Sequence, residues 1–212
     1  MNTANLRTEY LRSALDENDA GDEPMALFHR WFTEAVASGV QDVNAMTLAT
    51  CDLQGQPSAR IVLCKEYDER GFVFFTNYES RKGRELEANP RASLLFYWGH
   101  LERQVRIAGP VTRVAPRESD SYFSQRPRAA RIGAWASPQS QSIATRADLE
   151  RRVEEMDRRY PGESELPRPP HWGGLRLAAE SIEFWQGRPS RLHDRLLFLR
   201  RGERWERSRL AP

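Results

Sequence analysis

Five short segments with alternating side chains follow one another between residues 45 and 114, and they constrain the fold more than any other feature. They are rich in Val, Ile, Phe and Thr, and short turns such as 52–55 and 68–71 separate them. A period of two residues is typical of β-strands, and short connections join antiparallel neighbours. The expected strands are 45–51, 58–65, 71–77, 92–98 and 104–114.

Three later runs, 174–185, 196–200 and 204–209, are expected to rejoin this meander. Closing such a sheet into a small barrel removes its exposed edges. Helices are expected at 24–39, 81–88, 116–125, 129–135 and 145–160, from proline and serine start signals and from apolar residues at helical spacing. The prediction is a mainly β (α+β) fold, a barrel with helices outside.

The chain has 212 residues and 39% hydrophobic content, which suits one sizeable core. We expect a mobile N-terminal arm, 1–23, with an acidic stretch at its end, and one domain, 24–212. The start of the chain has no apolar signal region, and no run is long enough to span a membrane, so a cytoplasmic protein without membrane contact is expected.

The net charge is only +2, from 32 basic and 30 acidic residues, which disfavours a nucleic-acid partner. Cys51 and Cys64 lie in apolar runs without C-x-x-C spacing, and we expect buried thiols. No metal site is expected.

The stretch 183–195 has the highest density of side chains that can bind a ligand or exchange a proton. A β-like run ending at Trp185 leads into it, and Gly187 and Pro189 break that run. In an extended segment, Arg191, His193 and Arg195 would face one way and suit a planar anion. The alternative is a polar hairpin with solvated arginines.

A second candidate is the turn 77–83, which joins a strand to the start of a helix. Free N–H groups at a helix N-terminus attract an anion, and Arg81 and Lys82 add two positive charges there. Lys65 and Lys82 are the only lysines among the 32 basic residues. A phosphate site is expected, the alternatives being a random basic turn and lysines retained by chance.

Weaker signals surround these two candidates. In the run 60–65, Ile61 and Leu63 are expected to point to the apolar side, with Arg60 opposite and Lys65 at the end, although a solvent-edge strand would show the same pattern. Tyr122 and Arg126 have the spacing of a phosphate clamp on a helix, or of a surface stack. Amide and hydroxyl groups that suit a heterocycle are offered by Gln104, Gln139 and Ser140.

Together these segments resemble the pyridoxine/pyridoxamine 5′-phosphate oxidase family, from about residue 24 to the last residue. The resemblance is carried, in order, by RIVLCK (60–65), TNYESRK (76–82), NPR (89–91), ERQ (102–104), YFSQRPR (122–128), IGAW (132–135), PHWGG (170–174), IEFWQG (182–187), RLHDR (191–195) and RLAP (209–212).

The resemblance implies a split β-barrel homodimer with FMN at the subunit interface. It implies FMN-dependent oxidation of pyridoxine or pyridoxamine 5′-phosphate to pyridoxal 5′-phosphate, with O₂ giving H₂O₂. The FMN contacts implied are Arg60, Ile61, Val62, Leu63, Cys64, Lys65, Phe75, Thr76, Arg81, Lys82, Gln104, Gln139, Ser140, Trp185 and Arg195. The substrate contacts implied are Lys65, Tyr122, Arg126, Arg191 and His193, with Arg7 and Tyr10 closing over the substrate. Arg191, His193 and Asp42 are implied as catalytic.

Ala130 departs from the family pattern, which usually places a serine there.

Three alternatives to this function stay open at this point. One is a flavin oxidase of the phenazine-pathway type, acting on another aromatic ring. The others are a flavin carrier without catalysis and an arginine-rich RNA-binding module.

Overall fold

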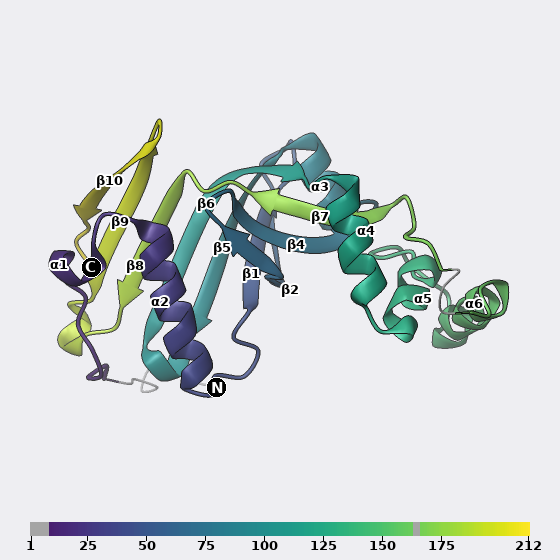
Figure 1. The fold of residues 1–212 in the computed structure, drawn as a ribbon, viewed down its shortest axis with the longest axis horizontal. Helices are drawn as coiled ribbons and strands as arrows, with labels where there is room; N and C mark the ends of the chain where they lie inside the picture. Colours follow the sequence, from purple (N-terminus) through teal and green to yellow (C-terminus); the bar gives the residue numbers. More distant parts are fainter. Residues whose placement is uncertain (1–8, 163–165) are drawn as a thin grey trace.

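The computed structural model describes residues 9–162 and 166–212, which form a curled antiparallel sheet with helices around it (Figure 1). Within these residues the sheet follows the path β10-β9-β8-β6-β5-β1-β2, while β3 pairs with β4 and β7 joins β4 to β6. The strands are β1 (Ala45–Cys51), β2 (Pro57–Leu63), β3 (Glu66–Asp68), β4 (Gly71–Asn77), β5 (Arg91–Trp98), β6 (Arg103–Arg113), β7 (Trp172–Leu177), β8 (Ser181–Gln186), β9 (Asp194–Arg201) and β10 (Arg204–Arg209).

The helices are α1 (Glu17–Ala20), α2 (Pro24–Ala37), α3 (Arg81–Ala88), α4 (Pro116–Gln125), α5 (Arg128–Ala136) and α6 (Arg146–Arg159), with short 3₁₀ turns η1 (Gly99–Leu101) and η2 (Pro189–Arg191). In Figure 1, α4, α5 and α6 extend from the end of the molecule reached by β4 and β7, whereas α1 lies at the opposite end beside β9 and β10. The predicted mainly β barrel class is confirmed: the fold is a split barrel.

The long strand β6 causes the sheet to curl, because it changes partners along its length. Its first part pairs with β8 and its last part pairs with β7. Gly109 lies at the change, where an added Cβ would stand 1.9 Å from the carbonyl oxygen of Ala178. Only glycine allows this close approach of two backbones.

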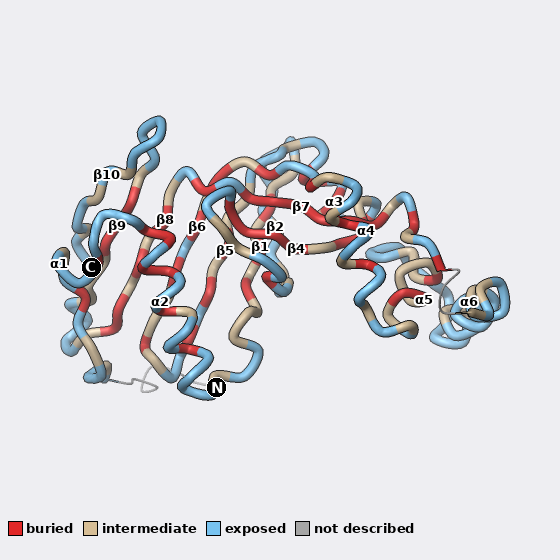
Figure 2. Tube along the Cα trace, viewed as in Figure 1, coloured by how far each residue is buried: buried red, intermediate tan, exposed pale blue. Residues whose placement is uncertain are grey.

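The core lies between the curled sheet and α2, as the buried segments in Figure 2 show. Phe28 on α2 is fully buried and contacts Phe72, Phe96 and Trp98 from the sheet, with ring centroids 4.9 to 6.1 Å apart. Edge contacts between aromatic rings add to the burial of apolar area. The apolar face expected for the helix at 24–39 therefore holds the barrel together.

Two expected elements differ from the structure. The run 174–185 is two strands, β7 and β8, because its middle residues meet the point where β6 changes partners. The run 58–65 ends at Leu63, and the three-residue strand β3 follows it.

Within the described residues, the N-terminal segment contacts the barrel from Tyr10 onward. Leu15 is 3% exposed, and its backbone N–H donates to the Asp194 carboxylate at 3.1 Å. The N–H of Arg12 donates to Glu102 at 3.0 Å. Arg7 lies outside the described residues. The mobility of the arm stays a prediction.

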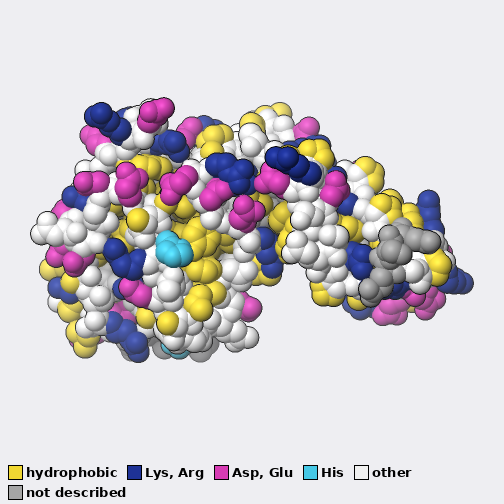
Figure 3. Space-filling model, viewed as in Figure 1, with side chains coloured by type: hydrophobic (Ala, Val, Ile, Leu, Met, Phe, Trp, Pro, Cys, Tyr) yellow, Lys and Arg dark blue, Asp and Glu magenta, His cyan; other side chains and the backbone are white. Residues whose placement is uncertain are grey.

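Charges are mixed over the surface. Figure 3 shows acidic and basic side chains interspersed on the visible face. In the described part of the chain, no helix has the length and apolar character needed to cross a membrane. Cys64 is buried, and burial raises the pKa of its thiol to about 12, whereas Cys51 is partly exposed.

Candidate functional site

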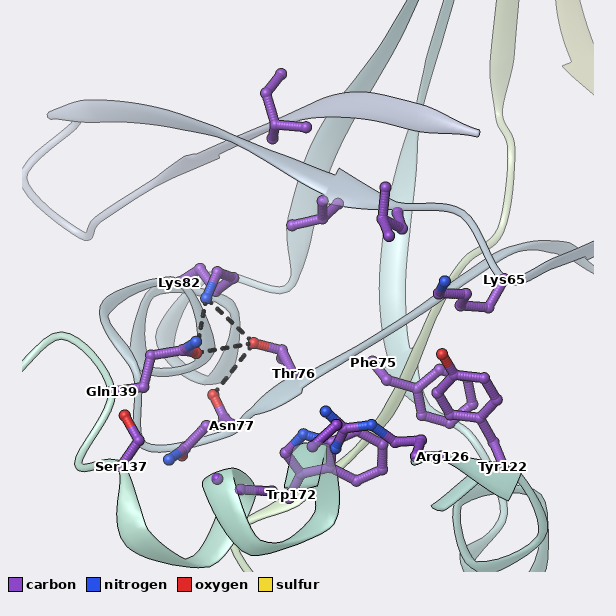
Figure 4. A pocket seen from close by; sticks show the side chains of 16 residues that line it. Lys65, Phe75, Thr76, Asn77, Lys82, Tyr122, Arg126, Ser137, Gln139 and Trp172 are labelled. Atoms are coloured by element: carbon purple, nitrogen blue, oxygen red, sulfur yellow. Dashed lines mark hydrogen bonds between the residues drawn. The ribbon is translucent and has the colours of Figure 1, made fainter. Parts of the chain in front are cut away.

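A cavity of about 610 Å³ opens between β2, β4 and the helices α4 and α5 (Figure 4). Its size is typical of a small-molecule site. Its lining combines apolar strand residues, cationic side chains and aromatic rings: Ile61, Val62, Leu63, Lys65, Phe75, Thr76, Asn77, Lys82, Tyr122, Arg126, Ala130, Gly133, Ala134, Ser137, Gln139 and Trp172.

One end of the cavity is built by the start of α3. Ser80 caps this helix by accepting the N–H of Gly83 at 3.3 Å. The Lys82 ammonium donates to Gln139 at 3.0 Å and to Thr76 at 3.2 Å, and Figure 4 shows these groups together. Burial, with the nearby charge of Arg60, lowers the pKa of Lys82. A cation and a helix N-terminus thus meet at one place, which favours an anion.

The other end has an aromatic wall and a second cation. The rings of Phe75 and Tyr122 stack with centroids 4.0 Å apart, and the nearly parallel ring of Trp172 lies beside both, 5.4 Å from Phe75 and 6.2 Å from Tyr122. The Arg126 guanidinium lies 4.6 Å from the centroid of Trp172. Its Nη1 is buried and has no hydrogen-bond partner among the described residues. Burial lowers the pKa of Arg126.

Such a buried unpaired donor indicates a missing acceptor, because nearly all buried polar groups in proteins are hydrogen-bonded. Lys65 also lines the cavity, and Figure 4 shows it on the same side as Tyr122. Lys65, Tyr122 and Arg126 thus line one cavity, as the clamp prediction requires.

The expectation that Ile61 and Leu63 point to the apolar side is wrong for the single chain. Ile61 is 65% exposed and Leu63 is 40% exposed, and both line the cavity. The even positions of β2 face inward instead: Val62 packs on the core and Arg60 is partly buried. The face of β2 that carries Ile61 and Leu63 is therefore exposed within the described chain.

Arg60 and Arg81 do not line the cavity. Both guanidinium groups bind the Glu85 carboxylate, at 3.3 Å from Arg60 and 2.8 Å from Arg81. Glu85 was not recognised in the sequence, although its i, i+4 spacing from Arg81 was a signal. Trp172, Asn77 and Ser137 were also missed as lining residues. Trp172 lies in the PHWGG segment, and the family resemblance was the only signal in the sequence that pointed to this segment.

A second cluster forms around the end of β8 and the start of β9. The ring centroids of Trp185 and His193 are 4.5 Å apart, and Tyr10 contacts both at 5.7 and 5.8 Å. Gln104 on β6 pairs with Trp185 in the sheet. Arg195 on β9 donates to Glu183 at 2.8 Å.

The predicted one-sided face of Arg191, His193 and Arg195 is wrong. Arg191 is not extended: it ends the turn η2 with φ of 60°, and Ser190 has φ of 54°. Arg191 is exposed, while Arg195 turns to Glu183 within the sheet. The turn intervenes because Pro189 starts a short 3₁₀ segment there.

His193 has a defined tautomer. Its Nδ1 lies 3.1 Å from the backbone N–H of Arg188, so Nδ1 accepts and a neutral ring carries its proton on Nε2. Burial lowers the pKa of His193 below 6.5, and the charge of Arg191 lowers it further.

The cluster and the cavity lie apart within the chain. β8 is separated from β2 by β6, β5 and β1 along the sheet path, and Figure 1 shows the ends of β8 and β9 far from α4 and α5. Neighbouring strands in a sheet are about 4.8 Å apart, so the three intervening strands hold β8 well away from β2.

Asp42 and Ser140 are exposed turn residues with φ of 49° and 69°, and neither lines the cavity.

Two family models match this chain. Residues 32–160 match the model described as pyridoxamine 5′-phosphate oxidase. Residues 172–212 match the model described as the pyridoxine 5′-phosphate oxidase C-terminal dimerisation region. β8, η2 and β9 lie within the second match.

Curated relatives named pyridoxine/pyridoxamine 5′-phosphate oxidase align over nearly the whole chain. The one from Rubrobacter xylanophilus is 56% identical over 99% of this chain and 96% of its own length. The one from Burkholderia vietnamiensis is 59% identical over 99% of this chain and 98% of its own. Among solved structures, PhzG from Burkholderia lata, in complex with tetrahydrophenazine-1-carboxylic acid, has a TM-score of 0.87 at 33% identity, covering 94% of this chain and 98% of that one.

Proposed function

Since this chain belongs to the pyridoxamine 5′-phosphate oxidase family, we propose that it oxidises pyridoxine and pyridoxamine 5′-phosphate to pyridoxal 5′-phosphate, with FMN as cofactor and O₂ as electron acceptor giving H₂O₂. One observation carries the proposal: a single cavity has two separate cationic ends, one at Lys82 and one at Arg126. Two phosphorylated molecules, a flavin mononucleotide and its substrate, need two such ends. A cytoplasmic location stays a prediction from the sequence.

The residues at the α3 end fit FMN. Lys82, Thr76 and Gln139 already share hydrogen bonds around one point, and the helix N-terminus adds its dipole. Arg60 and Arg81 would supply further charge for the phosphate. The exposed apolar side chains Ile61 and Leu63 offer a surface for the flavin ring. When bound, FMN supplies the redox chemistry, taking a hydride equivalent from C4′ of the substrate and passing electrons to O₂.

The Arg126 end fits the substrate phosphate. The buried Nη1 of Arg126 would gain its missing acceptor, with Lys65 and the Tyr122 hydroxyl beside it. A phosphate fixed there orients the attached pyridine ring in the cavity, and orientation is the main contribution of the protein to the rate. Ala130 offers no hydroxyl, so the usual serine contact is absent.

We further propose a homodimer in which each cavity is completed by the second copy. The C-terminal match is to a dimerisation region, which supports the dimer. Trp185, Arg191 and His193 lie in this region and far from the cavity of their own chain. A two-fold interface would bring these residues to the other copy's cavity, with Arg191 and His193 over the substrate ring.

The pH profile tests the role of His193. Because the pKa of His193 is lowered from 6.5, the ring is neutral at pH 7 and offers Nε2–H to the substrate. We expect kcat/KM to stay flat from about pH 8 down to about pH 6.5 and to fall below it, because a proton on Nδ1 would break the hydrogen bond from the Arg188 N–H that holds the ring in place. His193→Asn should be slower and should lack that acid limb. An unchanged acid limb in the variant would remove His193 from this role.

A phenazine-type substrate is the second candidate, because the PhzG structure matches this fold at 33% identity. The α5 wall of the cavity is also lined by small residues, Ala130, Gly133 and Ala134, which leave room for a larger ring. The test compares kcat/KM for pyridoxine 5′-phosphate and for tetrahydrophenazine-1-carboxylic acid. We expect a preference of about 100-fold or more for the phosphate ester, since Arg126 and Lys65 recognise its dianion. The reverse preference would establish the second candidate.

A further inference from the structure

Glu85 is a buried carboxylate that joins two arginines to the strands beneath them. It lies on α3, one turn after Arg81, and its side chain is 7% exposed. Its Oε1 accepts from Nε of Arg81 at 2.8 Å. Its Oε2 accepts from the hydroxyls of Thr50 and Ser58 at 2.5 and 2.6 Å and from Nη2 of Arg60 at 3.3 Å. Both oxygens of the carboxylate are therefore hydrogen-bonded.

The hydroxyls of Thr50 and Ser58 also link Arg60 to Glu85 indirectly, through hydrogen bonds to both side chains. Thr50 and Ser58 are register partners across β1 and β2. Nη1 of Arg60 donates to Thr50 and Nη2 donates to Ser58, both at 2.5 Å. Each hydroxyl thus accepts from Arg60 and donates to Glu85. Such a satisfied network fixes the plane and the position of the guanidinium.

The charge of this group of residues suits a phosphate monoester. Burial alone would raise the pKa of Glu85, but hydrogen bonds from Ser58, Thr50 and the two arginines lower it to about 2, so it is ionised at pH 7. Three cations, Arg60, Arg81 and Lys82, and one carboxylate leave about two positive charges. A phosphate monoester carries about −1.5 to −2 at this pH.

We propose that Glu85 is a positioning residue for the cofactor phosphate: it holds the guanidinium groups of Arg60 and Arg81 in place at the start of α3 before the phosphate binds. The inference rests on the proposed function, which places FMN at this end of the cavity. Without Glu85, the three cations would repel one another and the two arginine side chains would have to be ordered by the ligand itself. Order present before binding raises affinity.

The test compares the dissociation constants of FMN and riboflavin for the full-length, flavin-free protein, measured by quenching of flavin fluorescence. Riboflavin has the same ring without the phosphate. We expect the unmodified protein to prefer FMN. Glu85→Gln should weaken FMN binding about tenfold or more and change riboflavin binding less than about twofold.

Glu87→Gln is the matched control. Glu87 lies on the same helix, is 69% exposed, and pairs with Arg113 at 2.7 Å instead of with Arg60 or Arg81. The substitution removes the same charge from α3, and neither flavin should bind differently. If Glu85→Gln does not fold, Ser58→Ala removes one of the two hydroxyl links and should weaken FMN alone by a smaller factor.

Three results would contradict the inference. FMN binding that is unchanged or tighter in Glu85→Gln would mean that the carboxylate only opposes the phosphate. Equal losses for FMN and riboflavin would indicate a general structural role. A failure of the unmodified protein to distinguish FMN from riboflavin would overturn the proposed phosphate site itself, and the inference with it.

Discussion

Arg191→Met is expected to lower kcat about 100-fold while FMN stays bound. Arg191 lies in the exposed turn η2, and it forms no ion pair among the residues that the structure describes. Its charge nevertheless reaches His193 and lowers the pKa of that ring. In the proposed dimer this free guanidinium faces the substrate in the other copy's cavity, where it holds the ring in the reactive orientation. Met has a similar length and no charge.

The substitution does not change the conformational cost of the positive φ of 60° at this position, since Arg and Met are both unbranched at Cβ. The loss therefore reports on the guanidinium. Steady-state kinetics gives kcat, and the flavin absorbance of the purified protein gives FMN content. Arg152→Met, at an exposed position of α6 outside both the cavity lining and the dimerisation region, is the control and should keep full activity. Full activity in Arg191→Met would refute the assignment.

Arg126→Ala is expected to raise KM for the phosphorylated substrate by about 10- to 100-fold, the loss that follows when a charged hydrogen bond is removed. The protein should not become less stable by a similar amount. Nη1 of Arg126 is buried without a hydrogen-bond partner, so the free protein bears the cost of an unsatisfied charged group. Removing that cost offsets the lost contact with Trp172.

KM from initial rates and the unfolding midpoint in urea test the two halves of this expectation. Arg126→Lys is a useful second variant, because it keeps the charge and loses the planar guanidinium. Its KM should lie between those of the unmodified protein and Arg126→Ala. An unchanged KM in Arg126→Ala would remove Arg126 from the phosphate clamp. A large loss of stability with an unchanged KM would make its contact with Trp172 purely structural.

Local signals predicted the elements that build the cavity. Ser80 and the Asn89-Pro90 pair delimit α3, and Pro116 opens α4, so both helices lie where the sequence places them. The strand at 71–77 is also as expected, since Gly71 and Asn77 end its apolar run. These boundaries depend on caps and turns, which are properties of a few adjacent residues.

Features that depend on distant contacts were not predictable in this way. The break between β7 and β8 follows from the change of partners along β6. Ile61 and Leu63 point outward because Val62, on the opposite face of β2, packs against the core. Periodicity reports that two faces differ, but it does not say which face meets the core. The turn at Arg191 likewise depends on the whole loop between β8 and β9.

The separation of the two site clusters has the same origin. A single sequence read along its length groups Arg191 and His193 with Tyr122 and Arg126 only through the family resemblance. In the chain itself, three strands stand between β8 and the edge strand beside the cavity. In the proposed dimer, the second copy brings the two clusters together, and no local pattern in the sequence predicts which residues form such an interface.

Aerobic incubation of the purified, FMN-supplemented protein with pyridoxine 5′-phosphate tests the proposed oxidase activity. Pyridoxal 5′-phosphate is followed by its absorbance, and H₂O₂ by a coupled peroxidase. We expect both products to form in equal amounts, because each two-electron oxidation of the substrate reduces one O₂. If FMN binds in the cavity and neither product forms, the proposed activity is wrong and a phenazine-type substrate explains the site better.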